Sequence, residues 1–156
     1  MEIEAAELRD LYQEVILDHG RRPRNRRAME GASVSAHGDN PMCGDRVTVF
    51  LRLDDDERVA DISFEGRGCA ISMASASLMT ELVKGKSRGE AEALFQDLRA
   101  MCTGAELPNA SPEEALERLA VLSGVKDFPS RVKCATLAWH TMDAALAGHT
   151  DTVTTE

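Results

Sequence analysis

Three of the four cysteines lie where the chain is predicted to change direction, and the surroundings of two of them favour the thiolate form. Cys43 comes two residues before Asp45, and the intervening Gly44 lets the backbone fold so that a thiolate and a carboxylate can converge. Cys69 follows a Gly-Arg-Gly break before a predicted helix, and Cys134 lies near the start of the last predicted helix. Amide dipoles at a helix N-terminus stabilise a thiolate, so both residues are candidate metal ligands or nucleophiles.

If these junctions meet in space, they form a metal site whose ligands are Cys43, Asp45, Cys69 and Cys134. Tetrahedral zinc accepts sulfur and oxygen ligands, and iron–sulfur clusters are held largely by thiolates. Arg131 and Lys133, beside the third cysteine, would offset the negative charge of such a site. The spacing is not that of a zinc finger, and no C-x-x-C pair is present. From the residues alone, each cysteine could therefore also be a small buried apolar side chain.

The fourth cysteine and the histidines are weaker candidates. Cys102 lies at the end of a predicted helix with no acidic or glycine-rich companion, which favours a buried, structural thiol. The four histidines favour structural or surface roles, and His37, two residues before Asp39, is the most plausible neighbour of the site.

The composition bounds the function classes. The chain of 156 residues is the size of one domain, residues 1–156, and 43% of its residues are hydrophobic, which is enough for a core. A net charge of -9 argues against nucleic acid and against a polybasic membrane anchor. No stretch is apolar for long enough to span a bilayer, and the acidic N-terminus lacks the features of a signal peptide. We therefore expect a cytoplasmic protein whose cysteines are ligands, catalytic thiols or buried residues rather than disulfides.

One segment is basic although the whole chain is acidic. Residues 21–27 contain five arginines in an acidic protein. This run is either a solvated loop, which is the usual outcome, or a docking patch for an acidic partner surface.

The hydrophobic pattern changes from a helix to strands and then to helices. An amphipathic helix is predicted over residues 4–18, followed by three strands at residues 33–37, 45–53 and 59–65. Short links between successive strands indicate an antiparallel sheet. Helices follow at about residues 71–84, 91–100, 111–122 and 131–146. The sequence thus predicts an α+β domain with a three-stranded antiparallel sheet and about five helices.

The helix boundaries carry their own signals. Ser87 and Glu90 fit a capping box, and Ser111 followed by Pro112 fits an N-cap with proline at the first helical position. Residues 101–110 are the only candidate flexible insert, residues 124–129 are predicted as a loop, and the polar tail of about residues 149–156 is expected to fray.

The three cysteine motifs together resemble a known family. Asn-Pro-Met-Cys-Gly-Asp at 40–45, Gly-Arg-Gly-Cys-Ala-Ile-Ser at 66–72 and Arg-Val-Lys-Cys-Ala-Thr-Leu-Ala-Trp at 131–139 look like the motifs of the U-type (NifU/IscU-like) iron–sulfur cluster assembly proteins. Residues 11–19 and 23–25 also resemble that family, and the match covers roughly residues 8–147.

The family has two main branches. In the IscU branch a histidine directly precedes the third cysteine, and the protein is a scaffold for a [2Fe–2S] cluster. Here that position is Lys133, and residues 101–124 include an extra helix that IscU proteins lack. Both features resemble the SufU branch, whose members bind zinc and accept sulfur from a PLP-dependent cysteine desulfurase of the SufS type.

The resemblance implies a small three-stranded antiparallel sheet packed on helices, with the metal at one exposed end. It implies zinc bound by the four residues of the cysteine motifs named above, with Cys43, on a mobile loop, as the sulfur acceptor. Arg131 matches the family arginine that supports the Cys134 thiolate or the metal. The expected partners are the SufS-type desulfurase, one of whose histidines would displace Cys43 from zinc, and downstream Suf assembly proteins. The chain would be a sulfur carrier and co-substrate of the desulfurase rather than a stand-alone enzyme.

Two alternatives remain. The first is an IscU-like scaffold that assembles iron into a [2Fe–2S] cluster on the same ligands, against which Lys133 counts. The second is a binding module whose zinc is purely structural, although such sites usually have closed ligand sets dominated by Cys and His.

Overall fold

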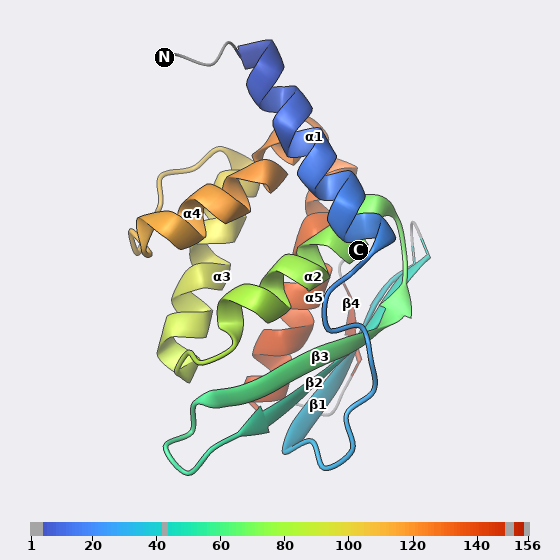
Figure 1. Ribbon diagram of the computed structural model, residues 1–156, viewed down its shortest axis with the longest axis vertical. Coiled ribbons are helices and arrows are strands. Elements are labelled where there is room, and N and C mark those ends of the chain that lie inside the picture. Colours follow the sequence, from blue (N-terminus) through green and yellow to red (C-terminus); the bar gives the residue numbers. More distant parts are fainter. Residues whose placement is uncertain (1–4, 42–43, 149–151, 155–156) are drawn as a thin grey trace.

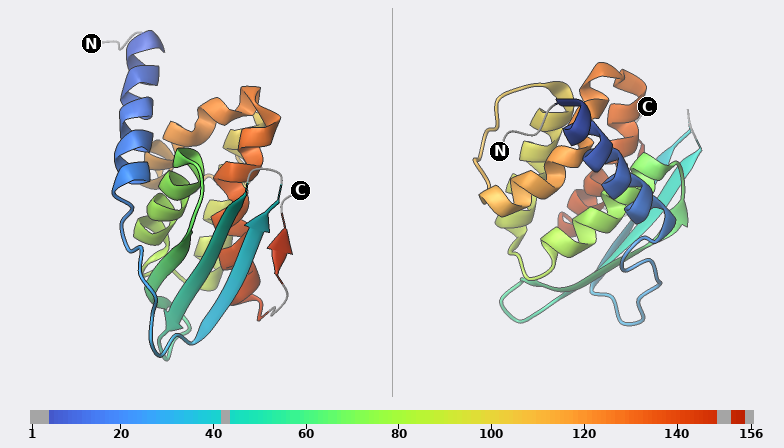
Figure 2. Two further views of the ribbon diagram at one scale, coloured as in Figure 1. Left: turned by 90° about the vertical axis from the view of Figure 1, so that its right-hand side faces the viewer. Right: turned by 45° about the horizontal axis from the view of Figure 1, so that its top comes forward.

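The computed structural model describes residues 5–41, 44–148 and 152–154, with side chains described from residue 11 onward. In chain order the elements are α1 (Ala5–Arg21), β1 (Val34–Asn40), β2 (Asp45–Leu53), β3 (Val59–Arg67), α2 (Ala70–Val83), α3 (Arg88–Thr103), α4 (Glu113–Leu119), the 3-10 helix η1 (Ala120–Asp127), α5 (Pro129–Leu146) and β4 (Val153–Thr154). Helices α2 and α5 pack on one face of the sheet, and α1 lies along α2 (Figures 1 and 2). The α+β class predicted from the sequence is confirmed.

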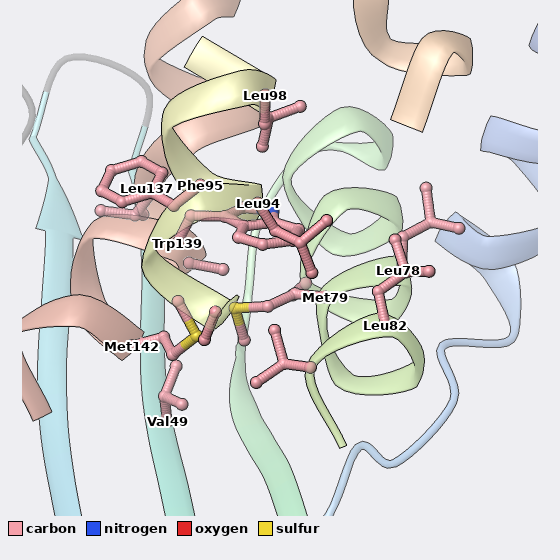
Figure 3. Close-up of a cluster of buried hydrophobic side chains, with 14 of the residues drawn as sticks. Val49, Leu78, Met79, Leu82, Leu94, Phe95, Leu98, Leu137, Trp139 and Met142 are labelled. Carbon is pink, nitrogen blue, oxygen red and sulfur yellow. The ribbon is translucent and has the colours of Figure 1, made fainter. Parts of the chain in front are cut away.

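Alternation along β2 explains which face of the sheet is covered. Val47, Val49 and Leu51 are buried, whereas Arg46 and Arg52 on the opposite face are exposed. The buried side chains meet apolar residues of α2, α3 and α5 in one core, in which Trp139 and Met142 of α5 lie beside Met79 of α2 (Figure 3). Among the described residues, none of the helices has the length and apolar character needed to cross a membrane.

The sheet has four strands in the order β3-β2-β1-β4, so the prediction of three antiparallel strands is wrong by one strand. The two-residue strand β4 runs parallel to β1, with Gly38 opposite Val153 and Asp39 opposite Thr154. The prediction of a frayed tail is therefore wrong for residues 153–154, and residues 149–151 and 155–156 lie outside the described residues. A strand this short pairs mainly through its backbone, so it leaves no hydrophobic period in the sequence.

Strand β1 is longer than predicted, and this matters for the site. It continues past His37 to Asn40, which pairs with Asp45 at the start of β2. Gly38 allows the strand to lie close to α5, because a Cβ at this position would collide with the Thr141 hydroxyl. The extended β1–β2 ladder ends next to Pro41 and Gly44, the described residues that flank Cys43.

The N-cap predicted for α3 is present, but the N-cap predicted for α4 is not. The capping box is present, since the Glu90 amide donates to Ser87 Oγ and the Ser87 amide donates to the Glu90 carboxylate, both at 3.2 Å. Helix α4, in contrast, has Pro112 as its N-cap, and the Ser111 side chain does not cap it. Ser111 instead donates to the buried carboxylate of Asp97 on α3, from both its amide and its hydroxyl. Residues 124–127, predicted as loop, belong to η1, and α5 starts at Pro129.

Asp97 ties Asn109, near the end of the predicted flexible insert of residues 101–110, and Ser111, just after it, to α3. Its side chain is fully buried and accepts the Asn109 amide at 2.9 Å in addition to the two Ser111 donors. Burial of Asp97 tends to raise the pKa of its carboxyl, but the hydrogen bonds from Ser111 and Asn109 outweigh it and lower the pKa below its ordinary value of 3.8. The segment between α3 and α4 is thus held by a charged acceptor.

We expect Asp97→Asn to lower the free energy of unfolding by about 2–3 kcal/mol at neutral pH, because hydrogen bonds to a charged acceptor are lost. A lowered folded-state pKa stabilises the fold fully above the unfolded pKa, and this contribution disappears as pH falls through the folded pKa. The stability difference from the native chain should therefore be constant above about pH 5 and shrink below about pH 4. Urea unfolding at several pH values checks this, with Asp55→Asn in an exposed turn as the matched control; a difference that does not change with pH would contradict it.

Candidate metal centre

Three of the four predicted ligands meet at the end of the sheet where β1 and β2 join. Asp45 is the first residue of β2, Cys69 is the N-cap of α2, and Cys134 lies in the second turn of α5. One ligand atom from each residue lies within 4.8 Å of the other two. Cys43 lies outside the described residues, so its place in the set stays a prediction.

Buried polar contacts between α2 and α5 hold two of these ligands in place. Trp139 Nε1 donates to Ser75 Oγ at 3.0 Å, and Ser75 Oγ donates to the Ala135 carbonyl at 2.5 Å. All three residues are buried; Cys69 is the N-cap of α2, and Cys134 lies in the second turn of α5. The N-terminal ends of α2 and α5 are thereby fixed side by side.

The Asp45 carboxylate is oriented by the backbone of the loop that carries Cys69. Its Oδ1 accepts the Cys69 amide at 2.9 Å, and its Oδ2 lies 3.9 Å from Cys69 Sγ. That separation is close to the roughly 3.6 Å expected between sulfur and oxygen ligands of one tetrahedral zinc ion. Gly68 makes the approach possible, because a Cβ there would lie 2.5 Å from Asp45 Oδ1.

Cys69 caps its own helix through sulfur. Its Sγ accepts the Ser72 amide at 3.4 Å, and its backbone has the extended conformation usual for an N-cap. Cys69 is also partly exposed, whereas Asp45 and Cys134 are buried, so the cluster opens to solvent on the Cys69 side.

Cys134 has a cationic neighbour in Arg131, the predicted supporting residue. The pKa of the exposed Arg131 guanidinium is raised above its ordinary value, first by hydrogen bonding to Cys134 and then by the charges of Cys69 and Cys134. Cys134 Sγ also lies 3.7 Å from the Ser130 carbonyl. Arg131 therefore lies close enough to both sulfurs to offset part of their negative charge.

The donor set fits a metal ion that prefers thiolate ligands. Two sulfurs and one carboxylate oxygen converge, and the carboxylate is anchored by a backbone amide in the manner of an outer-shell contact. Zinc and iron both accept such ligands. A fourth ligand from residues 42–43 would complete a tetrahedral set.

Other candidates from the sequence lie elsewhere. Cys102 is fully buried, and burial raises the pKa of its thiol to about 12, in agreement with a structural role. His37 is exposed, shares a 2.9 Å hydrogen bond with Thr48 and is not part of the cluster. His19 is buried and bonded to Ser77 of α2 at 2.7 Å.

Part of the basic run has internal contacts, and one of these supports the site. Arg24 pairs with Asp18 at 2.7 Å and Arg27 with Asp61 at 2.8 Å. Arg26 donates to the Gly66 carbonyl at 2.6 Å, near the end of β3 and three residues before Cys69. The sequence gives no sign of this contact, because no local pattern links residues forty positions apart. A docking role for the run stays a prediction.

Comparisons with known proteins agree with the geometry. The family of NifU-like N-terminal domains matches residues 11–135. The zinc-dependent sulfurtransferase SufU of Bacillus subtilis is 41% identical over 142 residues, which covers 91% of this chain and 93% of SufU. The iron–sulfur cluster assembly scaffold protein IscU of Streptococcus pyogenes is 39% identical over 141 residues, which covers 90% of this chain and 86% of IscU.

A solved structure gives the same result for the fold. The crystal structure of FiSufU from Fervidobacterium islandicum AW-1, proposed as an iron–sulfur cluster assembly scaffold for the SUF system, superimposes with a TM-score of 0.78. It is 35% identical, and the match covers 85% of this chain and 94% of that one. The second cysteine motif and the third thus lie on a fold shared with this group of proteins.

Proposed function

The chain belongs to the family of NifU-like N-terminal domains, and within that family we propose that it is a zinc-dependent sulfur acceptor for iron–sulfur cluster assembly. The observation that carries the proposal is the convergence of Asp45, Cys69 and Cys134 beside the exposed Arg131. The similarity to the zinc-dependent SufU of Bacillus subtilis supports zinc as the metal.

Four residues would hold the zinc ion: Cys43, Asp45, Cys69 and Cys134. Bound zinc would keep its thiolate ligands deprotonated at neutral pH. Arg131 would balance part of the excess negative charge, since three thiolates and a carboxylate around a divalent ion sum to about -2. The solvent-facing opening at Cys69 leaves the cluster accessible to a partner.

Cys43 is the proposed acceptor, because in the sequence it falls between the end of β1 and the start of β2, whereas Cys69 caps α2 and Cys134 belongs to α5. Its thiolate attacks the terminal sulfur of a persulfide on the desulfurase cysteine. The sulfur–sulfur bond of that persulfide breaks, and the desulfurase cysteine leaves as a thiolate. Cys43 then carries the persulfide, with no net oxidation in the exchange.

The proposed partner is a PLP-dependent cysteine desulfurase of the SufS type, followed by downstream Suf assembly proteins that take the sulfur. The protein would act in the cytoplasm, where reducing conditions keep its thiols free. It would serve as carrier and co-substrate of the desulfurase.

A second candidate is a scaffold that assembles a [2Fe–2S] cluster on the same ligands. The similarity to IscU of Streptococcus pyogenes favours it, because the shared region includes most of this chain. The side chain at position 133 argues against it, since a lysine with three donors and no acceptor cannot take the place of a ligating histidine.

Removal of zinc tests the proposal. We expect about one zinc per chain, and we expect chelation to stop the stimulation of a SufS-type desulfurase while the far-ultraviolet circular dichroism stays native. Global unfolding on chelation would instead favour a purely structural zinc. A stable, visible-absorbing cluster after anaerobic reconstitution, with zinc-loaded protein inactive, would favour the scaffold.

A further inference from the structure

A second concave site lies between α3 and α5, next to β4. The cleft has a volume of about 330 Å³ and is lined by Arg99, Thr103, Lys133, Thr136, His140 and Thr154, among others. No aspartate or glutamate is among the described residues that line it. Figure 1 shows the two helices that form its walls. The metal centre described above uses none of these side chains.

Two of the basic side chains are held by one aromatic ring. The Arg99 guanidinium carbon lies 5.6 Å from the centroid of the Phe95 ring, as in a cation–π contact. The His140 ring meets the same phenyl ring edge to face, with centroids 4.7 Å apart and planes at 82°. Phe95 is buried in the core, so it gives both groups a fixed support. The Arg99 guanidinium and the His140 ring are therefore held in position without a bound ligand.

The charge of the cleft is opposite to that of the whole protein. Within the described part of the chain, no carboxylate lies within ion-pair distance of Arg99 or Lys133. Burial and then the positive charge of Arg99 lower the pKa of His140, which is consistent with a positive potential there. Within the described part of the chain these two cations thus have no acidic partner, which leaves both of them available to a bound anion.

We propose that this cleft binds a phosphorylated small molecule, with its phosphate between Arg99 and Lys133 and within reach of His140. The planar fork of an arginine and the point charge of a lysine are common phosphate-binding groups, and together they match a dianion better than a single carboxylate. The volume lies at the lower end of the range for small-molecule sites. A concave site of this size favours a small molecule over an acidic polypeptide segment.

The proposal is independent of sulfur transfer, but the two sites are neighbours. Lys133 directly precedes Cys134 in the sequence, yet its side chain lines this cleft between the helices. Lys133, which stands where the scaffold branch has a histidine, therefore lines this cleft rather than the metal centre.

Nuclear magnetic resonance of the His140 side chain in the full, metal-loaded chain tests the proposal. Inorganic phosphate and ribose 5-phosphate are the probes, and acetate at matched ionic strength is the control. We expect saturable shifts of the His140 signals with phosphate probes only, and tighter binding of ribose 5-phosphate than of free phosphate. Arg99→Gln and Lys133→Gln should each weaken binding about tenfold, because each removes a charge-assisted contact. Arg88 is an exposed arginine at the start of α3, the helix that also carries Arg99, and Arg88→Gln should leave the affinity for phosphate unchanged.

Three outcomes would overturn the proposal. The first is the absence of saturable shifts with either phosphate probe. The second is equal weakening by Arg88→Gln and Arg99→Gln, which would indicate general charge screening. The third is tight binding of a glutamate-rich peptide that phosphate does not displace, which would assign the cleft to an acidic polypeptide.

Discussion

Cys43→Ala should abolish the stimulation of a SufS-type cysteine desulfurase by this protein, reducing turnover to that of the desulfurase alone. The variant removes the sulfur that the proposed exchange uses as nucleophile, and the proposal assigns the transferred sulfur to Cys43 alone. The assay is sulfide or alanine release from cysteine, with the variant at saturating concentration. Saturation separates lost chemistry from weakened docking.

Cys102→Ala is the matched control, since it removes a thiol that is fully buried and held protonated by a pKa of about 12. This variant should keep the stimulation, and its cost should be limited to stability, because a small cavity is created in the core. If Cys43→Ala retained full stimulation, or if both variants lost it to the same extent, the assignment of Cys43 as the acceptor would be wrong.

Gly68→Ala should lower the affinity for zinc about 10- to 100-fold, the range typical of changes to groups that orient a metal ligand. The added methyl group would lie 2.5 Å from Asp45 Oδ1 and 2.9 Å from Asp45 Cγ, so the carboxylate must leave its bond with the Cys69 amide. Competition with a chromophoric chelator measures the affinity. The ligands themselves remain unchanged in this variant.

Gly89→Ala serves as the control for this experiment, because a Cβ on that glycine meets nothing within 4 Å. It should leave zinc affinity unchanged. An unchanged affinity in Gly68→Ala would mean that Asp45 does not bind the metal in the position described here. A similar loss in both variants would point to a general effect of alanine on folding.

Local signals predicted much of the fold. Alternation of Val47, Val49 and Leu51 predicted β2 with its observed bounds, and the capping-box pattern predicted the Ser87 cap of α3, although the helix itself was expected only over 91–100. The failures arose where a distant group overrode a local signal. Ser111 follows the N-cap pattern but is taken by Asp97, fourteen residues earlier, and Val153 gains its strand partner from β1.

Three residues of the candidate site were expected to lie together, the fourth, Cys43, lies outside the described residues, and the contacts that hold the three in place were not predicted. Cysteine motifs indicated Asp45, Cys69 and Cys134, and the structure brings these three together. The contacts that hold these three residues join segments that are far apart in the sequence, so the spacing of residues along the chain does not predict them. The close passage of Gly68 past Asp45 and the bond from Arg26 to Gly66 are examples that no local pattern indicates.

The location of the transferred sulfur tests the central claim most directly. The zinc-loaded protein is incubated with desulfurase and cysteine, the free thiols are alkylated, and the peptides are analysed by mass spectrometry. We expect one additional sulfur atom on the peptide that contains Cys43 and none on the peptides that contain Cys69, Cys102 and Cys134. An unmodified Cys43, with the persulfide on Cys69 or Cys134 instead, would contradict it.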